Sequence, residues 1–194
     1  MTTWGWVFIG LAAIAVVVAA AWTVATQRRT RRLRQGFGPE YDRTLETAES
    51  KREAEAELAM RRERREQLDI RPLSPAARER YLESWRSVQA QFVDDPEGAV
   101  LTADGLIRSV MAERGYPVEE FDQRAADISV DHPRVVENYR QGHRLASMDG
   151  DRSTEDLRQA MRHYRALFEE LVEWDGGDET VADERTARRE RVVR

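Results

Sequence analysis

The sequence contains no cysteine and only one lysine, Lys51, among its 31 basic residues. The absence of cysteine excludes disulfide bonds, thiolate catalysis and cysteine-ligated zinc or iron–sulfur centres. A phosphate-binding loop is also missing, because neither Gly36-Phe37-Gly38 nor Asp175-Gly176-Gly177 lies between a strand and a helix. Charge is missing from residues 1–27, although charged residues make up 35% of the chain. These absences exclude several classes of enzyme, and the lack of charge makes the N-terminal segment the most unusual part of the composition.

Residues 4–26 form a continuous apolar segment that is long enough to cross a bilayer. As a helix this segment would be about 35 Å long, against a hydrocarbon core of roughly 30 Å. Helix is expected because backbone groups find no water in that core. The tryptophans at its ends, Trp4, Trp6 and Trp22, are typical of interfacial anchors. We therefore expect residues 1–27 to be a single transmembrane anchor.

A basic collar follows the apolar segment and predicts its orientation. The collar consists of Arg28, Arg29, Arg31, Arg32 and Arg34. Positive charge usually stays on the cytoplasmic side, so the N-terminus should lie outside and the remaining chain in the cytoplasm, at the cell membrane. A cleaved signal peptide is the alternative, but it would have basic residues before a shorter apolar stretch.

The chain beyond the collar is acidic. The collar takes five of the 31 basic residues, which leaves 26 against all 36 acidic residues. Such a body would not attract phosphates, so we expect no nucleic-acid binding. The collar is then the part of the chain with charge suited to an anionic leaflet.

The remaining sequence predicts an all-α protein. Residues 28–39 end in a glycine- and proline-containing break, and residues 40–71 are rich in Glu, Ala and Arg, which predicts a charged, solvated stalk helix. Residues 72–174 show four main amphipathic helices and one short helix, around residues 118–126, and should form a bundle. Residues 175–194 have no hydrophobic period and should be a disordered tail. Ser74 and Ser153 are expected helix caps, and Gly115 an expected helix end.

Seven residues in the bundle segment are candidates for the core or for a partner-binding face. They lie on the apolar stripes of the predicted helices: Tyr81, Trp85, Phe92, Tyr139, His143, Tyr164 and Phe168. His143 and His163 could meet across two antiparallel helices, but their spacing lacks the usual metal-ligand elements. No acid/base pair or nucleophile motif is evident, so we expect no enzymatic activity, no cofactor and no metal site.

Several stretches resemble a known family. They are residues 34–43, residues 68–81, Ser129-Val130-Asp131-His132-Pro133 and residues 153–161. Together they resemble an uncharacterised family of small single-pass membrane or secreted proteins of high-GC Gram-positive bacteria. The resemblance covers roughly residues 30–172 and implies a bacterial source and a membrane topology. It implies no activity, ligand or site residue.

Two functions fit these observations. The first is a membrane-tethered cytoplasmic adaptor or scaffold, whose partners would be the lipid bilayer and a protein of unknown identity. The second is a sensory bundle that binds a small ligand or metal in its core, with His143 at the centre. Self-association is a further option, because Ala15 and Ala19 have the spacing of helix–helix contacts in membranes and the stalk could pair.

Overall fold

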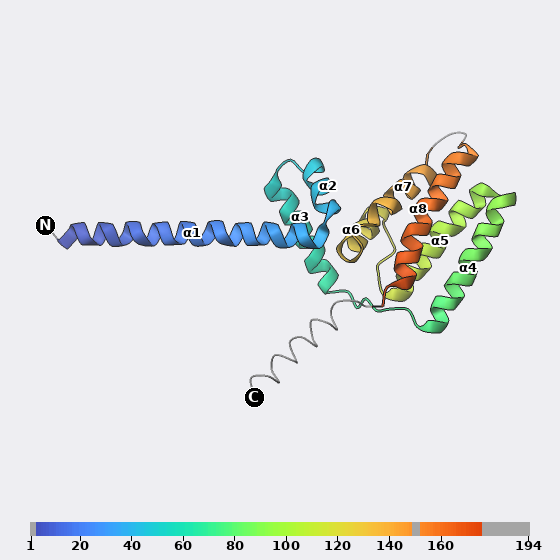
Figure 1. The fold of residues 1–194 in the computed structure, drawn as a ribbon, viewed down its shortest axis with the longest axis horizontal. Coiled ribbons are helices and arrows are strands. Elements are labelled where there is room, and N and C mark those ends of the chain that lie inside the picture. Colours follow the sequence, from blue (N-terminus) through green and yellow to red (C-terminus); the bar gives the residue numbers. More distant parts are fainter. Residues whose placement is uncertain (1–2, 149–151, 176–194) are drawn as a thin grey trace, which may run out of the picture. The chain divides into compact units, whose positions relative to one another are not determined.

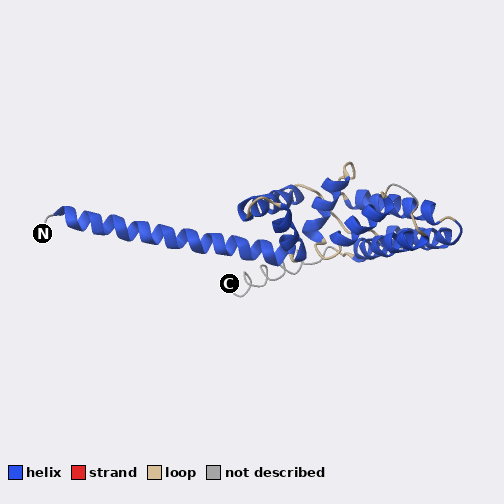
Figure 2. Cartoon of the chain, turned by 90° about the horizontal axis from the view of Figure 1, so that it is seen from above, coloured by secondary structure: helices blue, strands red, loops and turns tan. Residues whose placement is uncertain are grey.

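The computed structural model describes residues 3–148 and 152–175, and it describes no side chain for residues 3–13 and 15. The described residues form eight helices and no strand, which confirms the all-α prediction (Figure 2). The chain divides into two compact units, Met1–Met60 and Arg61–Arg194. The expected tail lies outside the described residues from residue 176 onward.

The N-terminal unit begins with the 35-residue helix α1, Thr3–Phe37 (Figure 1). Among the residues whose side chains are described, no helix is long and apolar enough to span a membrane. The side chains of the expected anchors Trp4 and Trp6 are not among those described, whereas the side chain of Trp22 is described and is 71% exposed.

The expected helix break at residues 35–39 is narrower than the sequence predicts. Helix α1 continues through Gln35 and Gly36, and the chain bends only at Gly38, whose φ is +47°. Leu33 and Phe37 are buried. Burial of such side chains outweighs the modest helix propensity lost at a single glycine.

The expected continuous stalk helix is also wrong. The structure has two helices instead, α2 (Pro39–Thr47) and α3 (Lys51–Glu66), separated at residues 48–50. The Glu53 N–H donates to Ser50 Oγ, and the Glu53 carboxylate accepts from the Glu49 N–H. These paired bonds start a new helix and favour the break. The two helices are not fully solvated either, since Tyr41, Thr44, Ala54 and Leu58 are buried.

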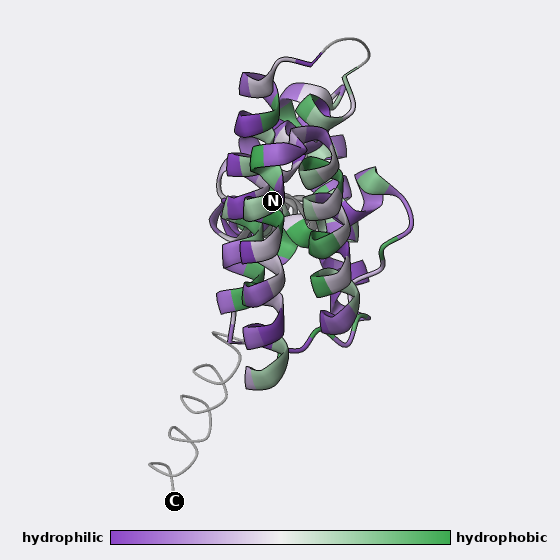
Figure 3. Cartoon of the chain, turned by 90° about the vertical axis from the view of Figure 1, so that its right-hand side faces the viewer, coloured by the Kyte–Doolittle hydropathy of each residue, from purple (hydrophilic) through white to green (hydrophobic). Residues whose placement is uncertain are grey.

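The C-terminal unit contains the rest of α3 and five further helices. They are α4 (Pro75–Asp94), α5 (Pro96–Arg114), α6 (Phe121–Asp131), α7 (Val136–Ala146) and α8 (Thr154–Glu173). Helix α5 packs against both α4 and α8, α8 packs against α7, and α6 packs against α7 (Figure 1). Figure 3 shows hydrophobic residues gathered on the faces between these helices. One contiguous core therefore holds the unit together.

The unit starts earlier than residue 72, where we expected the bundle to begin. The backbone N–H of Arg71 donates to the Arg114 carbonyl at 3.0 Å, and a Cβ on Gly115 would lie 2.3 Å from the Asp69 carbonyl oxygen. Arg65 pairs with Asp131. Residues 65–71, which the sequence predicts as part of the stalk, therefore contact the bundle through polar groups. Hydrophobic periodicity does not reveal such contacts.

The helix ends follow the local rules closely. Ser74 accepts from the Ala77 N–H, and Ser153 forms a capping box with Asp156. Gly115 ends α5 at a φ of +98°, a conformation that a side chain would strain. These three predictions are confirmed. Helix α6 runs to Asp131 instead of ending near residue 126, because Pro133 disfavours helical geometry only at the preceding His132.

Two glycines inside helices should respond oppositely to alanine. A Cβ on Gly142 would lie 2.7 Å from the ring of Tyr164, which is fully buried, whereas a Cβ on Gly105 would meet only the end of Arg108 at 4.0 Å. We expect Gly142→Ala to lower the free energy of unfolding by about 1–3 kcal/mol through overpacking. Gly105→Ala should raise it by about 0.5–1 kcal/mol, because alanine costs less entropy in a helix. Urea unfolding of residues 61–194 measures both, and equal effects would contradict this packing.

Candidate functional site

The structure places most candidate aromatic residues in the core. Trp85 on α4 stacks on Phe168 on α8, with ring centroids 4.6 Å apart. Tyr81 is buried, and its hydroxyl donates to Glu113 at 2.8 Å. Phe92 is half-buried at the margin of the core. This stripe is therefore an interior face of α4, and the structure leaves little of it exposed for a partner.

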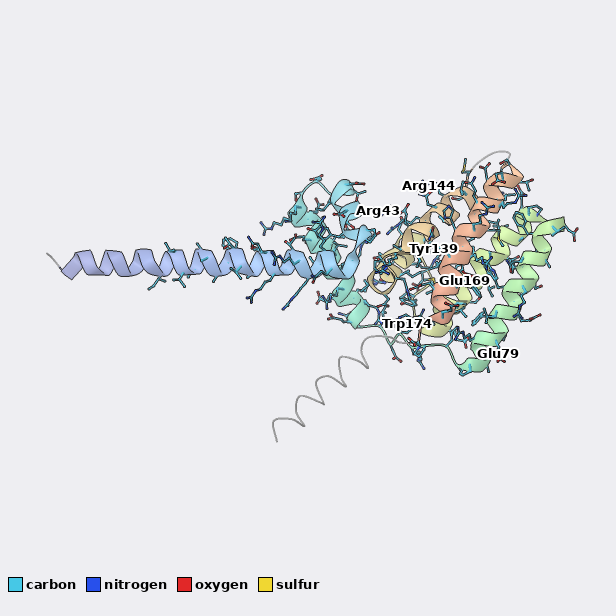
Figure 4. All side chains as sticks on the ribbon, in the orientation of Figure 1. Arg43, Glu79, Tyr139, Arg144, Glu169 and Trp174 are labelled. Carbon is cyan, nitrogen blue, oxygen red and sulfur yellow. The ribbon has the colours of Figure 1, made fainter. Side chains whose placement is uncertain are left out.

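The other candidates form a second group, the Tyr139 cluster, defined here as Asp104, Phe121, Arg124, Tyr139, His143 and Tyr164. Tyr139 is fully buried, and its hydroxyl accepts from Arg124 Nε at 3.0 Å (Figure 4). Burial raises the pKa of Tyr139 to about 12, so this hydroxyl is neutral and can donate or accept. Phe121 lies between Tyr139 and His143 and stacks on the His143 ring at 3.7 Å.

The histidines are engaged with different partners. His143 is half-buried against Phe121, and burial lowers its pKa despite the opposing influence of Asp104. His163 Nδ1 lies 2.9 Å from Asn138 Oδ1. Within the described ranges, no group of three or more histidine, aspartate or glutamate side chains could hold a metal ion. The structure therefore brings His143 into the Tyr139 cluster and assigns His163 to a separate contact.

A third group was not among the sequence-based predictions. We call it the Arg114 network and define it as Arg114, His132, Glu170 and Trp174. Arg114 is fully buried and donates from Nη1 to the Leu171 carbonyl at 3.1 Å. Its guanidinium lies 4.1 Å from the centre of the Trp174 ring, at the end of α8 (Figure 4). Burial lowers the pKa of Arg114, but an arginine remains charged in proteins. The network thus ties the ends of α5, α6 and α8 around one buried cation.

His132 joins this network through both ring nitrogens. Nε2 lies 3.3 Å from Arg114 Nη1, which can only donate, so Nε2 accepts and Nδ1 carries the hydrogen that bonds Glu170 Oε1 at 3.2 Å. Beside it, Asp131 Oδ2 accepts from both Arg65 and the Tyr116 hydroxyl. One clue was present in the sequence: Arg114 continues the apolar spacing of Ala103, Ile107 and Val110.

The protonation of His132 should make stability depend on pH. Burial lowers the pKa of His132 below its ordinary value, with the hydrogen bond to Glu170 opposing that shift. The unfolded chain therefore takes up this proton first, so stability is fully present above about pH 6.5 and is lost as the pH falls through the folded pKa. His132→Gln should flatten the dependence between about pH 7 and pH 5 in chemical unfolding of residues 61–194. His163→Gln is the matched control, and an equal change in that variant would contradict the assignment.

The collar arginines lie on α1 and are all exposed. Arg34 pairs with Asp42 at 3.5 Å. Beside the collar, a cleft of about 870 Å³ opens between α1 and the start of α3. Its lining includes Trp22, Arg29, Arg31, Lys51, Arg52 and Glu55. We call it the α1–α3 cleft.

Comparisons with known proteins add no relative to this picture. No protein-family model, curated protein or solved structure matches the chain.

Proposed function

We propose that the chain is a membrane-tethered adaptor, in which α1 holds a helical unit at the cytoplasmic face of the cell membrane. The observation that carries the proposal is the exposure of apolar side chains on α1. Ile14, Val16, Val17, Val18, Trp22 and Val24 are 46–71% exposed. A contiguous exposed apolar surface of this kind marks contact with lipid or protein. The apolar sequence of residues 4–13 would extend the same surface to the length of a bilayer.

The orientation follows from the collar. Five arginines follow the apolar segment within about two turns of helix, and no acidic residue precedes Glu40. The positive-inside rule then assigns the C-terminal unit to the cytoplasm. With one anchor and no enzymatic motif, the role we propose for that unit is to bind another protein near the membrane.

The adaptor proposal is tested by cross-linking the full chain in native membranes. We expect cross-links from residues of the C-terminal unit to one or a few proteins, recovered reproducibly at native abundance. A variant whose C-terminal unit is unfolded should lose them. Cross-links only between copies of this chain would replace the adaptor by a self-assembling scaffold, and the complete absence of protein cross-links would refute both.

The alternative is a ligand-sensing bundle centred on His143. The half-buried stack of His143 on Phe121 favours this role, because a planar ligand could stack on the same rings. Metal analysis and an absorbance spectrum of the purified chain distinguish the two roles. The adaptor proposal predicts a colourless, metal-free, folded protein, whereas a stoichiometric metal or chromophore would favour the sensor.

A further inference from the structure

The α1–α3 cleft gathers basic side chains from two helices. Arg29 and Arg31 come from α1, and Lys51 and Arg52 come from the first turn of α3. Glu55 is the single carboxylate in the lining, so cations outnumber anions four to one. Because the rest of the chain beyond the collar is acidic, this concentration of positive charge is a local feature and not a consequence of composition.

The negative charge of the one carboxylate in the cleft is balanced by neighbouring side chains of the same unit. Glu55 Oε1 accepts from the Thr30 hydroxyl at 2.7 Å and from the Tyr41 hydroxyl at 3.0 Å, and Lys51 Nζ lies 3.6 Å away. Burial alone would raise the pKa of Glu55, but these partners outweigh it and hold the pKa below its ordinary value. Glu55 therefore stays ionised and serves to join α1, α2 and α3 around the cleft.

The arginines are left available by this arrangement. Across the described part of the chain, Arg29, Arg31 and Arg52 have no ion pair or hydrogen bond to another side chain. Guanidinium groups bind phosphate oxygens in a planar, two-point geometry, and a lysine adds a point charge. A volume of about 870 Å³ is in the range of sites for small ligands. The chemistry of the cleft thus suits a phosphate group.

The position of the cleft along α1 suggests where the phosphate comes from. Trp22 is the exposed tryptophan at the end of the apolar segment and lines the cleft, about 10 Å along the helix from Arg29. Tryptophan is favoured at the level of lipid headgroups, and basic pockets beside the cytoplasmic end of a membrane helix suit anionic headgroups. The acyl chains of such a lipid could then lie along Val18 and Trp22, which are exposed.

We propose that the α1–α3 cleft binds the phosphate headgroup of an anionic phospholipid from the leaflet that α1 enters. This proposal rests on the membrane anchoring proposed above. Its consequence is that α2 and α3, which border the cleft or bond to its lining, are held at the membrane surface by a specific lipid contact in addition to the anchor.

The collar supplies a matched test. Arg29 and Arg31 line the cleft, whereas Arg28 and Arg32 belong to the same collar but do not. The cleft variant carries Arg29→Gln and Arg31→Gln. The control variant carries Arg28→Gln and Arg32→Gln, and it loses the same charge from the same helix. Lys51→Gln with Arg52→Gln tests the α3 side, and circular dichroism checks that helix content is retained. The probe is dansyl-labelled phosphatidylglycerol, added to the full chain in phosphatidylcholine bilayers and detected by energy transfer from tryptophan.

We expect unlabelled phosphatidylglycerol to displace the probe and phosphatidylcholine not to. The two cleft variants should each weaken binding roughly 10- to 30-fold, since each removes two charges near the anionic group, and the Arg28/Arg32 variant should change it less than about threefold. Equal loss in all three variants would show diffuse attraction by the collar and would overturn the proposal. Displacement by inorganic phosphate at matched ionic strength would overturn the assignment to a lipid.

Failure of the anchor can be separated from failure of the cleft. Carbonate extraction of cell membranes reports whether the chain is integral to the bilayer. The same lipid titration in detergent micelles reports on the cleft whether or not α1 inserts. An integral protein without a preference for phosphatidylglycerol would refute the cleft alone, and an extractable protein would refute the anchor.

Discussion

Replacing Trp85 with alanine should lower the free energy of unfolding of the C-terminal unit by about 3–5 kcal/mol, which is a large share of the 5–15 kcal/mol typical of a domain. Trp85 is only 5% exposed, and its ring stacks on Phe168 between α4 and α8. Truncation would leave a cavity that Phe168, itself fully buried, cannot fill without losing its own contacts. The indole N–H has no hydrogen-bond partner among the described residues, so the expected cost is one of packing.

Denaturant unfolding of residues 61–194 measures this effect, and Glu83→Ala on the same helix is the control. The Glu83 side chain is 75% exposed and pairs with Arg86, so its loss should change stability by no more than about 0.5 kcal/mol. An unchanged midpoint for Trp85→Ala would mean that the ring is accessible. The stripe of Tyr81, Trp85 and Phe92 would then be reassigned to a partner-binding surface.

Neutralising the collar should produce the second large effect, on topology. Replacing Arg28, Arg29, Arg31, Arg32 and Arg34 with glutamine removes the positive charges next to the apolar segment. We expect a mixed orientation, because positive-charge bias sets the direction of insertion. An enzymatic reporter at the C-terminus, active on one side of the membrane only, measures the mixture. Equivalent replacement of five exposed arginines in the C-terminal unit should leave the orientation unchanged, and an unaltered orientation in the collar variant would contradict the role of the arginines.

Local rules in the sequence predicted the caps and the hydrophobic stripes of the C-terminal unit. The Ser74 and Ser153 caps, the Gly115 helix end and the stripe containing Trp85 each depend on residues within one or two turns. Such features are visible without knowledge of the fold. The spacing of Tyr139, Tyr164 and Phe168 likewise identified buried positions.

Features that depend on distant contacts were missed. The Arg114 network joins α5 to Trp174 at the far end of the described sequence. Nothing within α5 shows that a buried arginine will find a carbonyl on α8 that lies 57 positions away. The stalk was misread for a related reason: its charged residues include Arg65, whose partner Asp131 is also remote. The break at residues 48–50 could have been found, because Ser50 followed by Glu53 is the pattern of a capping box.

Sided cysteine labelling tests the central claim most directly, namely that α1 tethers a cytoplasmic helical unit to the membrane. The natural chain has no cysteine, so a single introduced one reports its own position. Val93→Cys serves for the C-terminal unit, where Val93 is 81% exposed, and Thr2→Cys serves for the N-terminus. In intact cells, a membrane-impermeant maleimide should label Thr2→Cys and should label Val93→Cys only after lysis, with both variants retained in carbonate-washed membranes. Labelling of Val93→Cys in intact cells, or its recovery in the soluble fraction, would contradict the account.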